Sequence, residues 1–203
     1  MPSPPETLDL SINEVEMLAQ KAARGAGLPW GVAEDTGRAA AWLARRVGIW
    51  AGPLLALLEL PPPRQESPLY LAGLLADSAA GGQARAIARV ASPIWALPGV
   101  LATTLRPVVI QLDDARIGCG PGGEPSATLP AEALAALPAA ALTLTFPQAP
   151  PPLPPCLLPV RFRRSGVPLA EWLRLEALAY LTYVPASEHS RRTGAGAGLL
   201  DDE

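Results

Sequence analysis

The amino-acid sequence predicts an α+β protein with a helical N-terminal region, a central sheet and a C-terminal helix. Apolar residues recur at three- and four-residue spacing in the first 80 residues and again after residue 168, which is typical of helices. Between these regions, stretches rich in Val, Ile and Leu are bounded by prolines and indicate strands. The strands are spaced too irregularly for a βαβ repeat, so we expect an antiparallel or mixed sheet of about four strands.

The first helix is marked by signals at both of its ends. Residues 1–10 are rich in proline and are expected to be loose. Ser11 is followed three residues later by Glu14, the spacing of a capping box in which each side chain satisfies a free backbone N–H. Gly25 or Gly27 is expected to end the helix, because glycine readily adopts the conformation that follows one.

Three further helices are expected before residue 80. The second helix, from about Pro29 to Arg46, carries mostly small residues on its apolar face, which favours close packing against the first. The turn that precedes it, ARGAGLPWG, fits either a binding loop or a helix hairpin with a glycine stop. Two more apolar stretches, residues 49–60 and 68–78, predict shorter helices.

The middle of the chain predicts strands joined by short helices. We expect strands at residues 89–96, 107–112, 141–146 and 156–164, and short helices at residues 98–105 and 129–137.

Two motifs in this middle region resemble functional sites but favour turns. The paired acids Asp113 and Asp114 could hold Mg²⁺, yet acids after a strand more often make a turn. Residues 118–123, GCGPGG, have the spacing of a dinucleotide fingerprint, but Pro121 prevents the helix start that this motif requires. Cys119 has no His or Lys near it in sequence to activate a thiolate, which disfavours a nucleophile.

The last helix, residues 168–183, is apolar on almost all sides, which indicates a buried helix packed against the sheet. A glycine-rich tail follows it. We expect one domain over residues 1–203, with residues 11–80 as its helical part and residues 88–203 as the sheet, the C-terminal helix and the tail.

Charge and composition argue against several classes of function. The net charge is −3, the sequence pI is about 5.3 and no basic stripe is present, so we expect no nucleic-acid partner. The N-terminus lacks a basic and an apolar signal region, and prolines interrupt the longest uncharged runs, so we expect a cytoplasmic protein without a membrane span. One His and two distant Cys do not make a metal site, and we expect no cofactor.

The stretch from Tyr183 to Glu203 combines side chains that can bind ligands or transfer protons with glycines that leave the backbone unshielded. Unshielded glycine amides can bind an anion, hydroxyls and arginine can orient it, and a carboxylate or imidazole can move a proton. If the tail folds back on the turn between the first two helices, Trp30 could form an apolar wall. The candidate ligand-binding residues are Trp30, Ser187, Ser190, Arg191, Gly194, Gly196 and Gly198, and the candidate catalytic residues are Glu188 and His189. A loose, solvated C-terminus explains the same composition, so both interpretations stay open.

Two segments of the chain together resemble a bacterial family of uncharacterised proteins, classed as a domain of unknown function. They are SINEVEMLAQKAARGAGLPWGVAEDTGRAAAWL near the start and TYVPASEHSRRTGAGAGLLDDE at the end. The resemblance implies that the two ends belong to one functional unit, and it supplies no activity. Members of that family tend to finish in Asp-Asn-Asp, whereas this chain finishes in Asp201, Asp202 and Glu203.

Three functions are compatible with these features. The first is a binding or accessory protein that recognises a small anionic metabolite and works with an enzyme partner. The second is an enzyme of unassigned class that acts on such a metabolite through Glu188, His189 and Arg191. The third is a structural homodimer built on the Ala-rich helices, which needs no ligand. Arg191→Ala separates them, because only the first two predict lost binding or turnover.

Overall fold

The chain folds as an α+β protein, as the sequence predicts. The computed structural model describes residues 6–120, 124–148 and 156–183. The helices in these ranges are α1 (Ile12–Gly25), α2 (Trp30–Arg46), α3 (Ala51–Glu59), α4 (Pro68–Gly81), the 3₁₀ helix η1 (Pro93–Ala96), α5 (Leu97–Thr103), α6 (Ala131–Ala135) and α7 (Leu169–Tyr180). The strands are β1 (Thr7–Ser11), β2 (Arg85–Ala91), β3 (Val108–Leu112), β4 (Ala115–Cys119), β5 (Ser126–Ala127), β6 (Ala139–Thr145), β7 (Cys156–Leu157) and β8 (Arg164–Pro168).

The main sheet is antiparallel, which confirms one of the two expected arrangements. Its strand order is β2-β6-β3-β4-β5-β7, and every neighbouring pair is antiparallel. Four strands have five to seven residues, and β5 and β7 have two each. The number of long strands matches the expectation, but β4 was not expected, and the strand expected over residues 89–96 ends at Ala91 and is followed by η1. Leu142 pairs with Leu112 and is buried, whereas its neighbour Thr143 is exposed. One face of the sheet therefore packs on helices and the other faces solvent.

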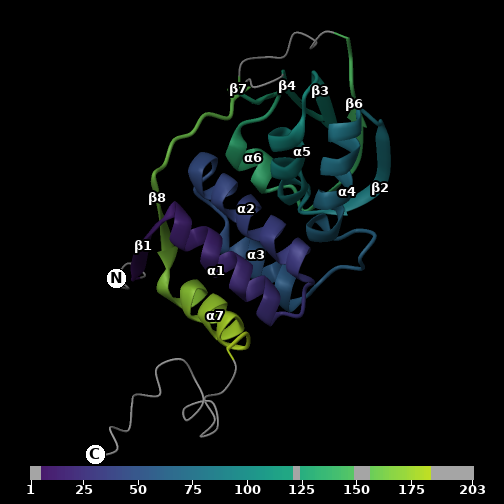
Figure 1. Cartoon of the computed structure of the whole chain (residues 1–203). Coiled ribbons are helices and arrows are strands. Elements are labelled where there is room, and N and C mark those ends of the chain that lie inside the picture. The colour runs from purple at the N-terminus through teal and green to yellow at the C-terminus, as the bar shows by residue number, and fades with distance from the viewer. Residues whose placement is uncertain (1–5, 121–123, 149–155, 184–203) are drawn as a thin grey trace, which may run out of the picture.

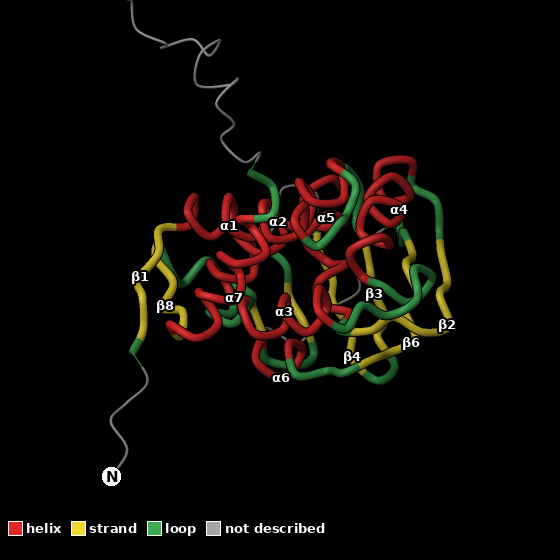
Figure 2. The backbone as a smooth tube through the Cα atoms, turned by 90° about the horizontal axis from the view of Figure 1, so that it is seen from below, coloured by secondary structure: helices red, strands yellow, loops and turns green. Residues whose placement is uncertain are grey.

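A second, two-stranded sheet corrects two expectations. Residues 7–10 were expected to be loose, but they belong to β1, which pairs antiparallel with β8. A single strand was expected over residues 156–164, but β7 ends at Leu157 and the next strand begins only at Arg164. Figures 1 and 2 show this pair of strands at the opposite end of the helices from the main sheet.

The first two helices form as predicted and pack closely. The Glu14 backbone N–H donates to Ser11 Oγ at 3.3 Å, and the Ser11 N–H donates to Glu14 Oε2 at 2.7 Å, which confirms the capping box. A Cβ atom added at Gly37 would lie 2.8 Å from the Glu16 carbonyl oxygen. The small residues of α2 therefore allow α1 to lie almost against its backbone.

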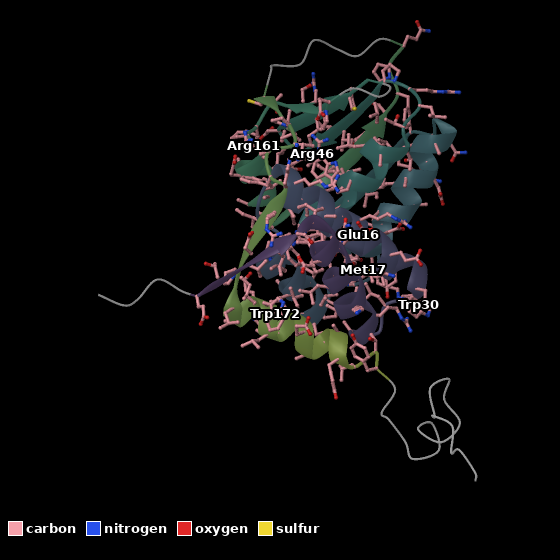
Figure 3. All side chains as sticks on the ribbon, turned by 60° about the vertical axis from the view of Figure 1, so that its left-hand side comes forward. Glu16, Met17, Trp30, Arg46, Arg161 and Trp172 are labelled. Carbon is pink, nitrogen blue, oxygen red and sulfur yellow. The ribbon has the colours of Figure 1, made fainter. Side chains whose placement is uncertain are left out.

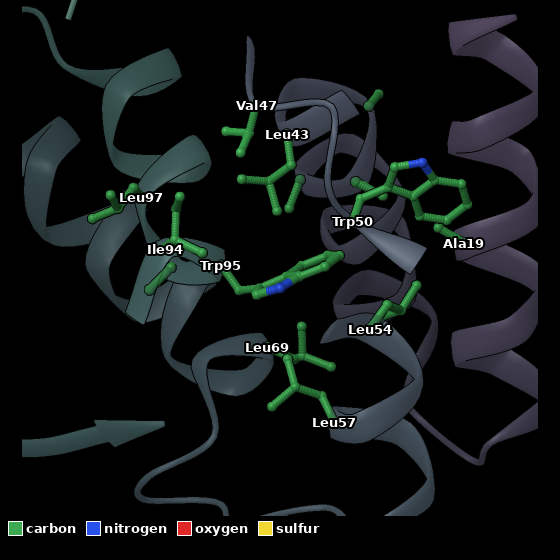
Figure 4. Packing of buried hydrophobic residues seen from close by; sticks show 14 of the residues in the cluster. Ala19, Leu43, Val47, Trp50, Leu54, Leu57, Leu69, Ile94, Trp95 and Leu97 are labelled. Atoms are coloured by element: carbon green, nitrogen blue, oxygen red, sulfur yellow. The ribbon is translucent and has the colours of Figure 1, made fainter. Parts of the chain in front are cut away.

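Two buried tryptophans connect the helices in the core. Figure 4 shows the Trp95 ring between Leu43 of α2 and Leu57 of α3. The Trp50 ring lies beside Ala19 of α1, and its indole N–H donates to Ser165 Oγ at 3.1 Å. Since β8 supplies that serine, the core is joined to the β1–β8 pair by a buried hydrogen bond.

The C-terminal helix is present, but its surroundings differ from the expectation. α7 packs on α1 and α3 rather than against the main sheet, and Figure 1 shows it alongside α1. Only Leu175 and Ala179 of this helix are buried, while Leu173 is 53% and Tyr180 73% exposed. Because α7 is apolar on almost all sides, its outer side forms a partly apolar surface of the molecule. Within the described ranges, no helix has the length and apolar character needed to cross a membrane.

Candidate functional site

Trp30 is the one candidate residue that falls within the described part of the chain. Ser187, Glu188, His189, Ser190, Arg191, Gly194, Gly196 and Gly198 lie outside the described residues. Trp30 begins α2 and its side chain is 62% exposed. It lines a pocket of about 420 Å³ together with residues from α1 and from the end of α7. We call this the Trp30 pocket; its lining is Met17, Gln20, Lys21, Arg24, Gly25, Trp30, Leu181 and Thr182.

The helical repeat of α1 places three of these side chains on one face. Met17, Lys21 and Arg24 are separated by four and three residues, so they lie above one another along the helix. The opposite face of α1 is buried in the core through residues such as Val15, Ala19 and Ala22. Figure 3 shows Met17 on this outer face, between Trp172 of α7 and Trp30.

Arg24 and Trp30 hold each other in place across the turn between α1 and α2. The guanidinium carbon of Arg24 lies 4.6 Å from the centre of the Trp30 ring, within the range of a cation–π contact. The same guanidinium donates to the backbone carbonyl of Leu28. Gly27, with a φ of +89°, allows the tight turn that brings Trp30 back towards α1. The pocket wall is therefore organised without a ligand.

Lys21 connects the pocket to the end of the described chain. It is the only lysine in the sequence. Its ammonium nitrogen lies 3.1 Å from the Tyr183 hydroxyl oxygen and 5.5 Å from the centre of that ring. Tyr183 is the last described residue before the tail. The last described residue before the tail therefore lies beside α1, in contact with Lys21.

A close backbone contact fixes α7 at this position. A Cβ atom added at Gly25 would lie 1.7 Å from the Leu178 carbonyl oxygen. Glycine at the end of α1 thus lets the last turn of α7 approach its backbone directly. The next residues, Leu181 and Thr182, then complete the pocket, and the Thr182 hydroxyl donates to the Ala179 carbonyl at 2.7 Å.

The Trp30 pocket is electropositive. Among the described residues that line it, Lys21 and Arg24 are cationic and none is Asp or Glu. Neither cation has a carboxylate within 4.0 Å in the described part of the chain. The neighbouring hollow, of about 280 Å³, shares Met17 and Lys21 but contains Glu14 and Glu176. Arg24 therefore lines only the Trp30 pocket, whereas Lys21 lies between the two hollows, with its ammonium on Tyr183.

The sequence analysis missed Lys21, Arg24 and Met17 as members of the site. A signal was present, because a single lysine lies three residues from an arginine on the polar face of a predicted helix. The contribution of Thr182 has no comparable signal, since it depends on how α7 crosses α1.

The other motifs have structural roles. Asp113 lies at the β3–β4 turn with a φ of +46°, and its carboxylate accepts a hydrogen bond from the Ala141 N–H at 3.1 Å, which confirms the turn. Cys119 is buried, and this burial raises the pKa of its thiol, which opposes thiolate formation. Within the described ranges, no group of three or more His, Cys, Asp and Glu residues is placed to hold a metal ion.

Comparison with known proteins links part of the chain to a protein family. Residues 10–49 match a family model described as "Protein of unknown function (DUF3726)". This segment contains α1, α2 and the turn between them, and so includes the wall of the Trp30 pocket from Met17 to Trp30. No match was found among curated proteins, and none among solved structures.

Proposed function

We propose that the protein binds a small anionic metabolite in the Trp30 pocket. The observation that supports this most directly is the pair of cations, Lys21 and Arg24, in a pocket whose described lining has no carboxylate. A carboxylate or phosphate placed between them would gain charge-assisted hydrogen bonds from both. Because Arg24 is already held against Trp30, little side-chain ordering would oppose binding.

The apolar part of the lining favours a ligand with a hydrocarbon portion. Met17, Trp30 and Leu181 are 50%, 62% and 68% exposed and all face this pocket. A volume of about 420 Å³ falls within the range of small-molecule sites. The best fit is therefore an organic acid or phosphorylated metabolite rather than a bare inorganic ion.

The tail is part of the proposal because it continues from Tyr183, beside Lys21. We propose that its donors complete the anion site, namely Ser187, Ser190, Arg191 and the amides of Gly194, Gly196 and Gly198. Proton transfer by Glu188 or His189 would turn the same site into a catalytic one. Binding does not require it.

Calorimetric titration of the full chain with citrate and with phenylphosphonate tests this function. We expect Lys21→Gln and Arg24→Gln each to weaken binding by about tenfold or more, because each removes a charged donor. Arg64→Gln, which removes an equal charge from an exposed arginine stacked on Tyr70, is the matched control and should bind as the wild type does. If neither probe binds at millimolar concentration, or if both pocket variants retain full affinity, the proposal is wrong.

Arg191→Ala then separates the two parts of the site. A loss of affinity comparable to that of Arg24→Gln would place the tail in the binding site. Unchanged affinity would limit the site to the described pocket. Trp30→Ala should lower affinity with little change in melting temperature, since the ring is largely exposed in the unliganded protein.

A further inference from the structure

A second pocket lies at the other end of α1, where the N-terminus of α1 meets the C-terminus of α2. It has a volume of about 410 Å³ and is separate from the Trp30 pocket. We call it the arginine pocket; the residues important here are Asn13, Arg45, Val160, Phe162 and Arg163. Figure 3 shows Arg161, adjacent in the chain, at the opposite end of the molecule from Trp30.

The chain between β7 and β8 is held against α2 by its backbone. The N–H groups of Arg161 and Phe162 both donate to the Arg45 carbonyl oxygen, at 2.8 and 3.0 Å. The Phe162 ring lies over Gly48, where an added Cβ would be 3.2 Å from the ring. These contacts fix the backbone immediately before Arg163. The side chains of Arg163 and Arg45 therefore line the same pocket.

The arginines in this region differ in their partners. Arg161 forms an ion pair with Glu132 at 3.0 Å, and Arg164 pairs with Asp9. Neither Arg45 nor Arg163 has a carboxylate within 4.0 Å among the described residues. No Asp or Glu is among the residues that line the pocket. The two arginines without a carboxylate are thus the two that face the pocket.

The backbone around the pocket opposes an anion less than a free helix end would. The C-terminal carbonyls of α2 would repel one, but Leu43 O accepts from Val47 and Gly48, and Arg45 O accepts as described above. At the start of α1, the N–H groups of Ser11 and Glu14 are used by the capping box. The site is therefore formed by side chains rather than by the helix terminus.

We infer that the arginine pocket binds a phosphate monoester whose organic part is apolar or aromatic. Arg45 and Arg163 can each present two N–H groups to phosphate oxygens, and the Asn13 side chain adds a further polar group on the lining. Val160 and Phe162 are 53% and 40% exposed and offer an apolar wall beside the cations. This site is distinct from the one in the proposed function and does not depend on it.

Phenyl phosphate and inorganic phosphate, titrated into the ¹⁵N-labelled full chain and followed by NMR, test the inference. We expect phenyl phosphate to shift the amide signals of Asn13 and Gly48 and to bind about tenfold more tightly than inorganic phosphate, because only the ester contacts the apolar wall. Arg45→Gln and Arg163→Gln should each weaken this binding by about tenfold or more. Lys21→Gln, in the Trp30 pocket, should leave the shifts at Asn13 and Gly48 unchanged.

Three results would overturn the inference. They are no shift at Asn13 and Gly48 with millimolar phenyl phosphate, shifts that survive in the Arg45→Gln, Arg163→Gln double variant, and equal affinity for the two probes. Should a glutamine variant fail to fold, Arg163→Lys retains the charge and loses only the paired donors. It should bind phenyl phosphate more weakly than the wild type, and equal binding would contradict the assigned role of Arg163.

Discussion

At the scale of single residues, Gly25 connects the fold to the Trp30 pocket. It ends α1 at the point where the backbone of α7 passes. Any side chain there would meet the Leu178 carbonyl group, which belongs to backbone and cannot rotate away. The position of Thr182 beside Arg24 and Trp30 therefore depends on the absence of a side chain at residue 25.

We predict that Gly25→Ala destabilises the protein and weakens ligand binding together. The added methyl carbon would lie 1.7 Å from Leu178 O, so α7 must shift, and overpacking of this kind costs about 1–3 kcal/mol. Gly31→Ala is the matched control, since it makes the same chemical change in the exposed first turn of α2 with no atom within 4 Å. Urea denaturation should show Gly31→Ala to be neutral or slightly stabilising. Similar urea midpoints for Gly25→Ala and Gly31→Ala would disprove the close contact between residue 25 and the Leu178 carbonyl.

The sequence predicts Trp30 as a candidate binding residue but does not predict most of the residues that line a pocket with it. The sequence of the ARGAGLPWG turn fits either a binding loop or a helix hairpin, and the structure shows a hairpin whose turn also lines a pocket. Lys21 and Arg24 could have been proposed from their spacing on α1. Thr182 and Leu181 could not, because the crossing of α7 over Gly25 is a contact between residues more than 150 positions apart.

At the scale of elements, local signals predicted helices better than strands. The capping box at Ser11 and the small residues of α2 act within a few residues, so α1 and α2 match the expectation closely. β1 was missed because its hydrogen bonds are made with β8 near the other end of the chain. The surroundings of α7 were missed for a related reason, since an all-round apolar pattern does not identify which neighbour covers which side.

The capping box predicts a pH-dependent stability for α1. Hydrogen bonding to the Ser11 side chain, and then to its backbone N–H, lowers the pKa of the Glu14 carboxyl below its ordinary value of 4.5. The folded state therefore favours the charged form, so the stabilisation is complete above pH 4.5 and is lost as the pH falls through the lower folded-state pKa. Glu14→Gln should be less stable than the wild type at neutral pH, and the difference should shrink at lower pH.

Thermal denaturation of both proteins between neutral pH and about pH 3 measures this difference, a range that spans the ordinary carboxyl pKa. Ser11→Ala removes the other side chain of the capping box and should lower the free energy of unfolding by about 1 kcal/mol at neutral pH. A wild-type advantage over Glu14→Gln that stays constant down to the lowest pH would show that ionisation of Glu14 plays no part.

At the scale of the whole molecule, Arg46 connects the N-terminal helices to the main sheet. It lies in the last turn of α2, its side chain is only 13% exposed, and its guanidinium carbon is 5.2 Å from the centre of the Trp42 ring. The guanidinium donates to the Leu158 carbonyl, just after β7, and to the Glu124 carboxylate near β5. One side chain thus fixes the far edge of the main sheet relative to α2.

The two partners of Arg46 should contribute unequally to stability. Glu124 is 53% exposed, and an ion pair with so exposed a carboxylate contributes about 0–1 kcal/mol. The bond to Leu158 O is partly buried, and loss of a charged donor there costs about 1.5–3 kcal/mol. Urea denaturation should therefore show a large loss for Arg46→Leu and a small one for Glu124→Gln. If Glu124→Gln proved as damaging as Arg46→Leu, the ion pair rather than the carbonyl bond would hold the sheet edge to α2.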